Sequence, residues 1–474
     1  MRAKKLLLIP ALLASACSVA PPIKAPSIPD AASYAAKGEL VPLNRKIALG
    51  KQIMSDWWTV FASQPLNDLI RMGVRNNYDL AAARETLAQA EEAVNAAGGA
   101  LLPQASIGAL AGRQKYGAAL FGPANFSIPP FSYYEAGPSV SWTPDLLGGG
   151  HRAVERQRAL AEYQSHQLDA AYLALTGNIV AATLDMASAA EEIAMVKRIL
   201  AEDSSTLELV KAAYEIGTGS KTDVLSEQTR LISDRAMLPP LEERLAVSRH
   251  ALSILVGEAP ANWVPPDLGL KDFALPKTLP LSLPSELVKR RPDILAARAN
   301  LDAAGAAVGM AEANLYPGIT LTANMMQEAL TPAGIFRSVS NAWSLAAGIS
   351  APIFDGGTLA AEKREAVHAY RAALAQYRQT ILASFGEVAD TLTSLARDEE
   401  SVAMMQHAAD TAQSSLGLIL ESYRAGASGL LQVQDAQRVW ASAQLDLVRA
   451  RHQRYRDCVR LFVALGGSPL PGKT

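Results

Sequence analysis

Apolar residues recur at every seventh position in the first half of the chain. The series is Tyr172, Ile179, Met186, Ile193, Leu200, Leu207 and Tyr214, and its companion positions hold Leu168, Leu175, Ala182, Ala189, Val196 and Val210. A strict seven-residue repeat on a helix of 3.6 residues per turn makes an apolar stripe that winds slowly around the helix. Such a helix stays buried only by supercoiling on a neighbour. The pattern therefore predicts a coiled-coil helix about 60 Å long over this series.

The same series recurs 209 residues later, with apolar residues at every step and a tyrosine at the same end: Ile381, Val388, Leu395, Val402, Ala409, Leu416 and Tyr423. Landmarks earlier in each half also match, because Asp79 and Pro103 correspond to Asp293 and Pro317 at an offset of 214. A nearly constant offset indicates an internal duplication in which only a connecting loop has changed length. We expect a first repeat at 65–260, a proline-rich linker at 261–284 and a second repeat at 285–468.

Before each long helix the pattern changes to alternation of apolar with small or polar residues. This predicts four strands, at 106–113, 134–142, 319–326 and 343–351. Strands of about ten residues with one apolar face are typical of a membrane β-barrel, with tryptophan near an end as an interface anchor. A half-buried hairpin in a soluble domain is the alternative that this pattern alone leaves open.

Glycine-containing turns follow both long helices, and each leads into a returning helix. The turns lie at 217–220 and 426–429, where glycine supplies left-handed backbone angles. Pro239 and Pro240 interrupt only the first returning helix, and we expect a kink there.

The first residues of the chain are typical of an export signal. Lys4 and Lys5 precede an apolar run that ends at Cys17. The triplet before this cysteine resembles the bacterial lipoprotein box, although Ala14 stands where leucine is most common. We expect a signal peptide at 1–16 and lipidation of Cys17, with plain cleavage as the alternative. Residues 17–64 are interpreted as a tether and 469–474 as a tail.

Composition and candidate chemistry exclude several classes of function. A net charge of −2 gives no indication of nucleic-acid binding. The six histidines show no metal-ligand spacing, and Gly217 to Thr222 is a poor match to a phosphate-binding loop because a serine precedes Lys221. We expect neither an enzyme nor a cofactor.

Four strands cannot close a barrel, and an open sheet edge in lipid would leave backbone groups unpaired at several kcal/mol each. Three copies of the chain would supply twelve strands, an even number within the range of known barrels. The sequence therefore predicts closure by several chains.

Together, the two Tyr-x-x-Gly turns, the Val-x-x-x-Gln runs at 224–228 and 433–437, the glycine turns after the strands and the signal ending at Cys17 resemble the TolC-like outer membrane factor family, in its NodT/OprM-type lipoprotein branch. The likeness covers about 65–468. It implies a mainly α fold: a homotrimer with a twelve-stranded outer-membrane β-barrel, four strands per protomer, continued into the periplasm by an α-helical coiled-coil barrel.

The resemblance also implies a function and partners. It implies the channel of a tripartite efflux system, a passive duct that takes small molecules from a periplasmic adaptor protein and an inner-membrane pump across the outer membrane. The alternatives are a duct for type I protein secretion and a periplasmic coiled-coil scaffold without a pore.

Several residues take expected roles from this resemblance. The turns at Gly217, Thr218, Gly219, Ser220, Gly426, Ala427, Ser428 and Gly429 would contact the adaptor. Asp435 would form a ring of carboxylates that constricts the periplasmic entrance, while Gln432 stands where some relatives have a second aspartate. Tyr423 and Arg424 would bond across the closed entrance. For Asp223 we prefer a helix cap with Ser220.

Overall fold

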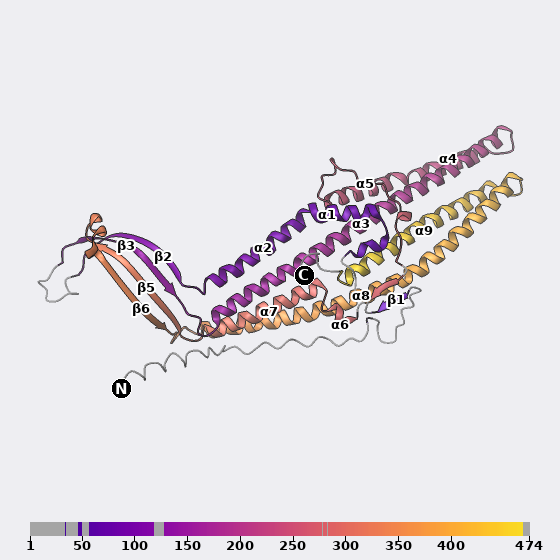
Figure 1. The fold of residues 1–474 in the computed structure, drawn as a ribbon. Helices are drawn as coiled ribbons and strands as arrows, with labels where there is room; N and C mark the ends of the chain where they lie inside the picture. The colour runs from indigo at the N-terminus through magenta and orange to yellow at the C-terminus, as the bar shows by residue number, and fades with distance from the viewer. Residues whose placement is uncertain are drawn as a thin grey trace. The chain divides into compact units, whose positions relative to one another are not determined.

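The computed structural model describes residues 34, 46–49, 56–117, 128–276, 278–281 and 283–467. The expected signal peptide 1–16, the lipidation site Cys17 and the tail 469–474 lie outside the described residues. The helices are α1 (Gln64–Asn76), α2 (Tyr78–Gly99), α3 (Gly149–Glu215), α4 (Lys221–Arg235), α5 (Leu238–Leu255), α6 (Pro284–Leu287), α7 (Pro292–Ala313), α8 (Thr358–Arg424) and α9 (Leu430–Ala464) (Figure 1). The strands are β1 (Lys46–Leu49), β2 (Gln104–Gln114), β3 (Phe131–Trp142), β4 (Thr278–Leu281), β5 (Gly318–Ala329) and β6 (Asn341–Ser350).

The chain divides into two compact units, and the long helices α3 and α8 each contribute to both. Among the described residues, the first unit comprises 86–117, 128–164 and 297–377. The second unit holds the remaining parts of α3 and α8 together with α4, α5 and α9. Each unit therefore draws on both halves of the duplicated sequence.

The first unit contains an antiparallel sheet of four strands in the order β2-β3-β5-β6 (Figure 1). Each predicted strand coincides with an observed one. The observed strands extend the predicted ones by one to three residues at most ends, and β6 ends one residue before the predicted end at 351. The register places Gly108 opposite Gly137 and Val140 opposite Ala323. Among the described residues, strands β2 and β6 each pair on one side only, so the sheet has two open edges in a single chain.

Strand β6 carries large apolar side chains that are exposed in the single chain. Trp343, Leu345 and Ile349 alternate along the strand and are 73%, 75% and 74% exposed in the single chain. A soluble sheet buries its apolar face, so this much exposed apolar surface indicates a surface that meets lipid or another chain.

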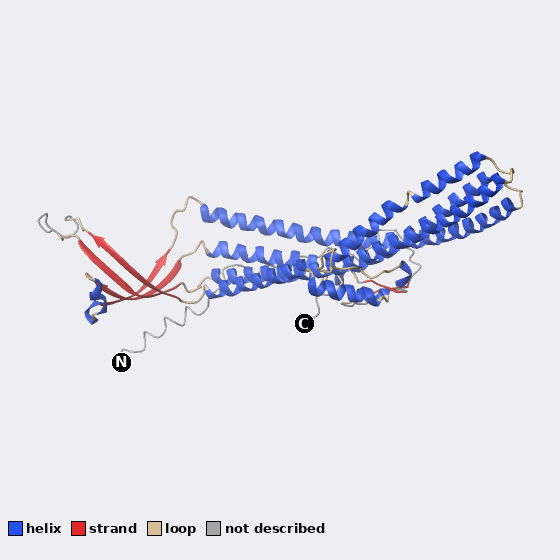
Figure 2. Ribbon diagram, turned by 90° about the horizontal axis from the view of Figure 1, so that it is seen from above, coloured by secondary structure: helices blue, strands red, loops and turns tan. Residues whose placement is uncertain are grey.

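The second unit is a helical bundle that contains two hairpins, α3 with α4 and α8 with α9, and both hairpin turns lie at the same end of it (Figure 2). The predicted heptad positions form its core, because Ile179, Met186, Ile381 and Val388 are all almost completely buried. The seam is confirmed along most of both helices, and only Tyr214 at the end of the first is substantially exposed. Among the described residues, no helix combines the length and apolar character that crossing a membrane requires.

The expected tether does not extend as far as residue 64. Trp57 and Phe61 lie in a short 3₁₀ helix and are almost fully buried, and the Trp57 ring stacks on Phe462 at 5.4 Å between centroids. Strand β1, within the same expected tether, pairs in parallel with β4. These aromatic side chains bury enough apolar surface to hold this end of the segment against the core.

The first returning helix is interrupted, as the proline pair predicts. Helix α4 ends at Arg235 and α5 begins at Leu238, so that Pro239 and Pro240 occupy the first turn of α5. Proline lacks a backbone N–H, and this position requires none because the first-turn N–H groups have no partner inside the helix. The corresponding helix in the second half, α9, runs unbroken over 35 residues.

We predict that Gly137→Ala disrupts the sheet, because a Cβ at this position would lie 2.1 Å from the backbone oxygen of Met325 on β5. Overpacking of this kind costs about 1–3 kcal/mol, and here a backbone would have to move. The measurement is the yield of heat-modifiable protein extracted from outer membranes in detergent, which should fall several-fold.

The matched control is Gly108→Ala, because Gly108 pairs with Gly137 but has open space where its Cβ would lie. Equal yields of the two variants would show that the close approach at Gly137 is not needed for folding.

Candidate functional site

The candidate site lies at the ends of the two hairpins in the second unit, where the sequence places the adaptor and gate residues. Gly217 and Gly426 have φ angles of +80° and +74°, a conformation that glycine adopts without strain. The N–H groups of Thr218 and Ala427 donate to the carbonyl oxygens of Ala213 and Ser422, each at 2.9 Å. The two turns therefore close their helices in the same way.

The first turn passes into α4 through the predicted helix cap, which is confirmed. The Asp223 N–H donates to Ser220 Oγ at 3.1 Å, and the Ser220 N–H donates to Asp223 Oδ2 at 3.0 Å. Gln432 caps the helix in the corresponding way at the second turn, where its Oε1 accepts a hydrogen bond from the Gly429 N–H at 3.0 Å. Both side chains thus satisfy backbone donors at a helix start.

The expected gate residues lie close to the second turn. Asp435 is on α9, and its side chain is 62% exposed and forms an ion pair with the exposed Arg438, one turn further along. Tyr423 and Arg424 are the last residues of α8. Burial, together with the nearby carboxylates of Asp223 and Glu227, raises the pKa of Tyr423, so this ring lies close to the first hairpin.

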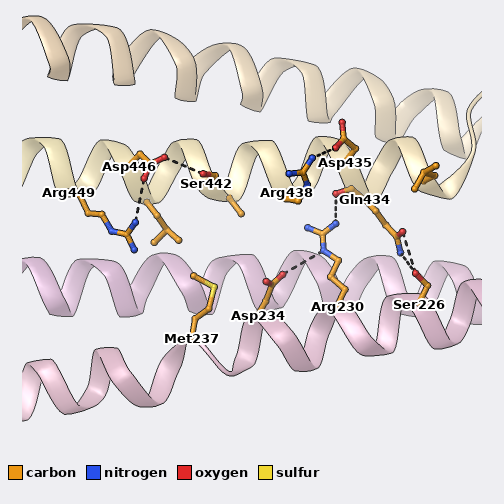
Figure 3. A pocket seen from close by; sticks show the side chains of 13 residues that line it. Ser226, Arg230, Asp234, Met237, Gln434, Asp435, Arg438, Ser442, Asp446 and Arg449 are labelled. Carbon is orange, nitrogen blue, oxygen red and sulfur yellow. Dashed lines mark hydrogen bonds and ion pairs between the residues drawn. The ribbon is translucent and has the colours of Figure 1, made fainter.

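A polar contact between the hairpins, which we call the clasp, joins Ser226, Glu227 and Arg230 of α4 to Gln434 of α9. Arg230 Nη1 donates to the backbone oxygen of Gln434 at 2.6 Å (Figure 3). The Gln434 amide donates to Glu227 Oε2 at 2.8 Å and to Ser226 Oγ at 3.2 Å. The clasp borders a groove of about 470 Å³ between α4 and α9, with Asp435 and Arg438 on its rim.

Buried acidic groups lie behind the clasp. Asp203 on α3 and Glu227 on α4 are almost completely buried, and Asp203 pairs with Arg230, whose Nε lies 3.4 Å from Oδ1. Burial, then sharing of a hydrogen bond with Asp234, raises the pKa of Asp203 to about 7 against the smaller opposing effect of Arg230. Gln437 completes this region by donating to Thr206 Oγ1 at 2.7 Å.

Sequence reasoning noticed Gln437 only as a landmark of the duplication, and it missed Asp203. A signal for Asp203 was present, since its position continues the companion series from Val196 to Val210 and is the one step that is not apolar. A charged residue inside an otherwise apolar seam is rarely buried unless it is paired, and it therefore marks a candidate functional position.

Within the described ranges, no group of three or more His, Cys, Asp or Glu side chains is arranged to hold a metal ion. The hairpin ends therefore offer turns, exposed charges and a polar contact between helices. This arrangement is suited to binding and to movement of helices.

The sequence model of the family described as outer membrane efflux protein matches residues 69–258 and 283–467. The chain belongs to the outer membrane efflux protein family. The two matched segments coincide with the two halves of the duplication, so the family match covers both hairpins and all four strands of the sheet.

Curated relatives cover nearly the whole of this efflux protein. It is 29% identical to nodulation protein T of Rhizobium leguminosarum bv. viciae, over 96% of this chain and 92% of that protein. It is 31% identical to the pyoverdine export outer membrane protein OpmQ of Pseudomonas aeruginosa, over 89% of this chain and 90% of that protein. The toluene efflux pump outer membrane protein TtgF of Pseudomonas putida is 29% identical over 96% of this chain and 94% of its own length.

Solved structures agree with this assignment. The outer-membrane channel OprN superimposes with a TM-score of 0.87 at 27% identity, over 95% of this chain and 99% of that one. The outer membrane protein VceC of Vibrio cholerae gives a TM-score of 0.80 at 25% identity, over 88% and 100%. The predicted fold class is confirmed, and the protein is an outer-membrane channel of the efflux type.

Proposed function

We propose that three copies of this efflux channel form a passive exit duct for small molecules in a tripartite system with a periplasmic adaptor and an inner-membrane pump. The observation that carries the proposal is the sheet with two open edges, β2 and β6, and apolar side chains exposed on it. Pairing the β6 edge of one copy with the β2 edge of the next would satisfy the backbone groups of both edges. Three copies would close a barrel of twelve strands.

The names of relatives support small organic molecules as cargo. Relatives are named for pyoverdine export and for toluene efflux, and one is named a probable outer membrane lipoprotein. By analogy we propose small molecules for this chain. Secretion of polypeptides is the alternative within the same architecture, and the inner-membrane partner decides between the two.

We propose Asp435 as the principal residue of the periplasmic gate. Its exposed side chain near the turn supports this role, because a threefold axis would bring three such carboxylates together and favour cations. Gln432 contributes less, since its amide oxygen is engaged in the helix cap. Tyr423 and Arg424 would hold the closed entrance from the end of α8.

Planar-bilayer conductance tests the duct and the gate together. We expect the wild type to give small, cation-preferring currents, and Asp435→Ala to give larger currents with less preference for cations. The reason is that the substitution removes both a carboxylate and its ion pair from the entrance.

Asp446→Ala is the matched control, because Asp446 is an exposed aspartate further along α9 that also pairs with an arginine. Equal currents from Asp435→Ala and the wild type would move the gate to other residues. Absence of current from every variant, in protein that is not trimeric in detergent, would favour the scaffold over the duct.

We further propose that the turns at 217–220 and 426–429 contact the adaptor. Their backbone is fixed by the helix closures, and the Cβ positions of Gly217 and Gly426 face open space. A photo-crosslinking amino acid at Thr218 or Ala427, in cells, should capture a periplasmic protein that has a long helical hairpin. The same probe at Ser204, exposed on α3 further from the turn, should not. Equal capture at Ser204 would contradict the assignment.

We propose that Cys17 anchors the chain to the outer membrane through lipid. Radioactive palmitate should label the wild type and the Cys458→Ser variant, but not Cys17→Ser, because Cys458 is buried in α9. Labelling that survives in Cys17→Ser would exclude this residue as the lipidation site.

A further inference from the structure

The carboxyl groups behind the clasp present a physical problem that the duct function leaves unexplained. Asp203 and Asp234 both pair with the guanidinium of Arg230, and the carboxyl of Glu227 lies near enough to act on Asp203 electrostatically. Asp203 and Glu227 are almost completely buried. If all three carboxyls were ionised, the group would carry an excess of negative charge in a region with little water. A proton or a cation must compensate.

A proton fits the contacts. With both carboxyls ionised, no donor would exist between Asp203 and Asp234. Among the described residues neither oxygen of Asp203 accepts a hydrogen bond, and Arg230 Nε, 3.4 Å from Oδ1, makes only an ion pair with it. One proton would supply that donor and remove one charge. A metal ion does not fit, because these side chains do not form a metal-binding group.

Arg230 connects this proton to the clasp. The same guanidinium faces Asp203 through Nε at 3.4 Å and Asp234 at 3.6 Å, and it donates to the Gln434 backbone through Nη1. When both aspartates are ionised, they draw the guanidinium toward themselves and compete with Gln434 for it. When a proton neutralises one of them, Arg230 is free to hold α9.

We propose that a proton held between Asp203 and Asp234 fastens the first hairpin to the second, so that the hairpin ends are held together most strongly in acid and loosen as the pH rises towards and just past neutral. The charged and polar groups around the proton come from all four helices: Asp203 of α3, Glu227, Arg230 and Asp234 of α4, Tyr423 of α8, and Gln434, Gln437 and the Asp435–Arg438 pair of α9. The inference is independent of whether Asp435 forms the gate.

The direction of the pH effect follows from linkage. The pKa of Asp203 is raised from 3.8 to about 7 in the closed arrangement, mainly by burial. A carboxyl with a raised pKa favours the closed arrangement most at low pH, and that contribution is lost progressively as the pH rises from about 4 to about 7. If opening exposes Asp203 to water, the equilibrium constant for opening increases about tenfold between pH 6 and pH 8. A protein without this carboxyl would not show that increase.

The proton itself is detectable by infrared spectroscopy of the full chain in detergent. The difference spectrum between wild type and Asp203→Asn at pH 6 should contain the carbonyl band of a protonated carboxyl, and the band should titrate away near pH 7. Burial, then a hydrogen bond shared with Asp457, also raises the pKa of Asp398 to about 7, so the difference between the two proteins is the relevant signal. Absence of the band from this difference at pH 6 would overturn the proposal.

Loosening is measured by hydrogen exchange of the α4 and α9 peptides nearest the turns. Comparing each variant with the wild type at one pH cancels the chemical exchange rate. Asparagine mimics the protonated aspartic acid, so Asp203→Asn should protect these peptides, and its protection relative to wild type should be about tenfold greater at pH 8 than at pH 6.

Asp446→Asn is the matched control, because this aspartate lines the groove but is exposed and does not pair with Arg230. Its protection relative to wild type should be the same at both pH values. Asp234→Asn is a second test variant, in which the infrared band should titrate below pH 7. If the protection of Asp203→Asn relative to wild type did not change between pH 6 and pH 8, the proposed role of the proton would be refuted. Neither measurement needs a current or an adaptor, so both remain decisive even if the proposed duct fails.

Discussion

The unpaired backbone groups at the two edges of the sheet are the constraint on which the rest of this structure depends. In the part of the chain that the structure describes, strands β2 and β6 each have one partner, and large apolar residues on both are exposed. In lipid, an edge must be paired, and a sheet of four strands is too short to pair with itself. Each strand pair leads directly into a long helix, so whatever closes the sheet also fixes where the α3 and α8 helices start.

The helices are subject to a different constraint, because they must pack along their whole length with few aromatic residues. A heptad seam meets it, and the residues that carry the seam are buried along most of α3 and α8. Near the turns the seam includes polar contacts, and the clasp from α4 to Gln434 joins the hairpins there. Apolar packing fixes the bundle, while polar contacts near its end are more easily broken.

Sequence patterns predicted the features that depend on local spacing. The two seams, the four strands, the glycine turns and the Ser220–Asp223 cap all follow from periodicity or from short motifs. The clasp could not be predicted in this way, because it depends on which faces of α4 and α9 meet after folding. The stacking partner of Trp57, Phe462, could not be predicted for the same reason, because it lies far along the chain.

The break between α4 and α5 gives the two hairpins different mechanical properties. Two residues, Ala236 and Met237, separate the helices, whereas α9 continues through the corresponding region without interruption. A helix bends most easily where its hydrogen-bond ladder stops, so bending of the first hairpin is concentrated at one point and the second hairpin is stiffer. The duplication gave the chain two similar hairpins, and the proline pair gave the first one a flexible point that the second lacks.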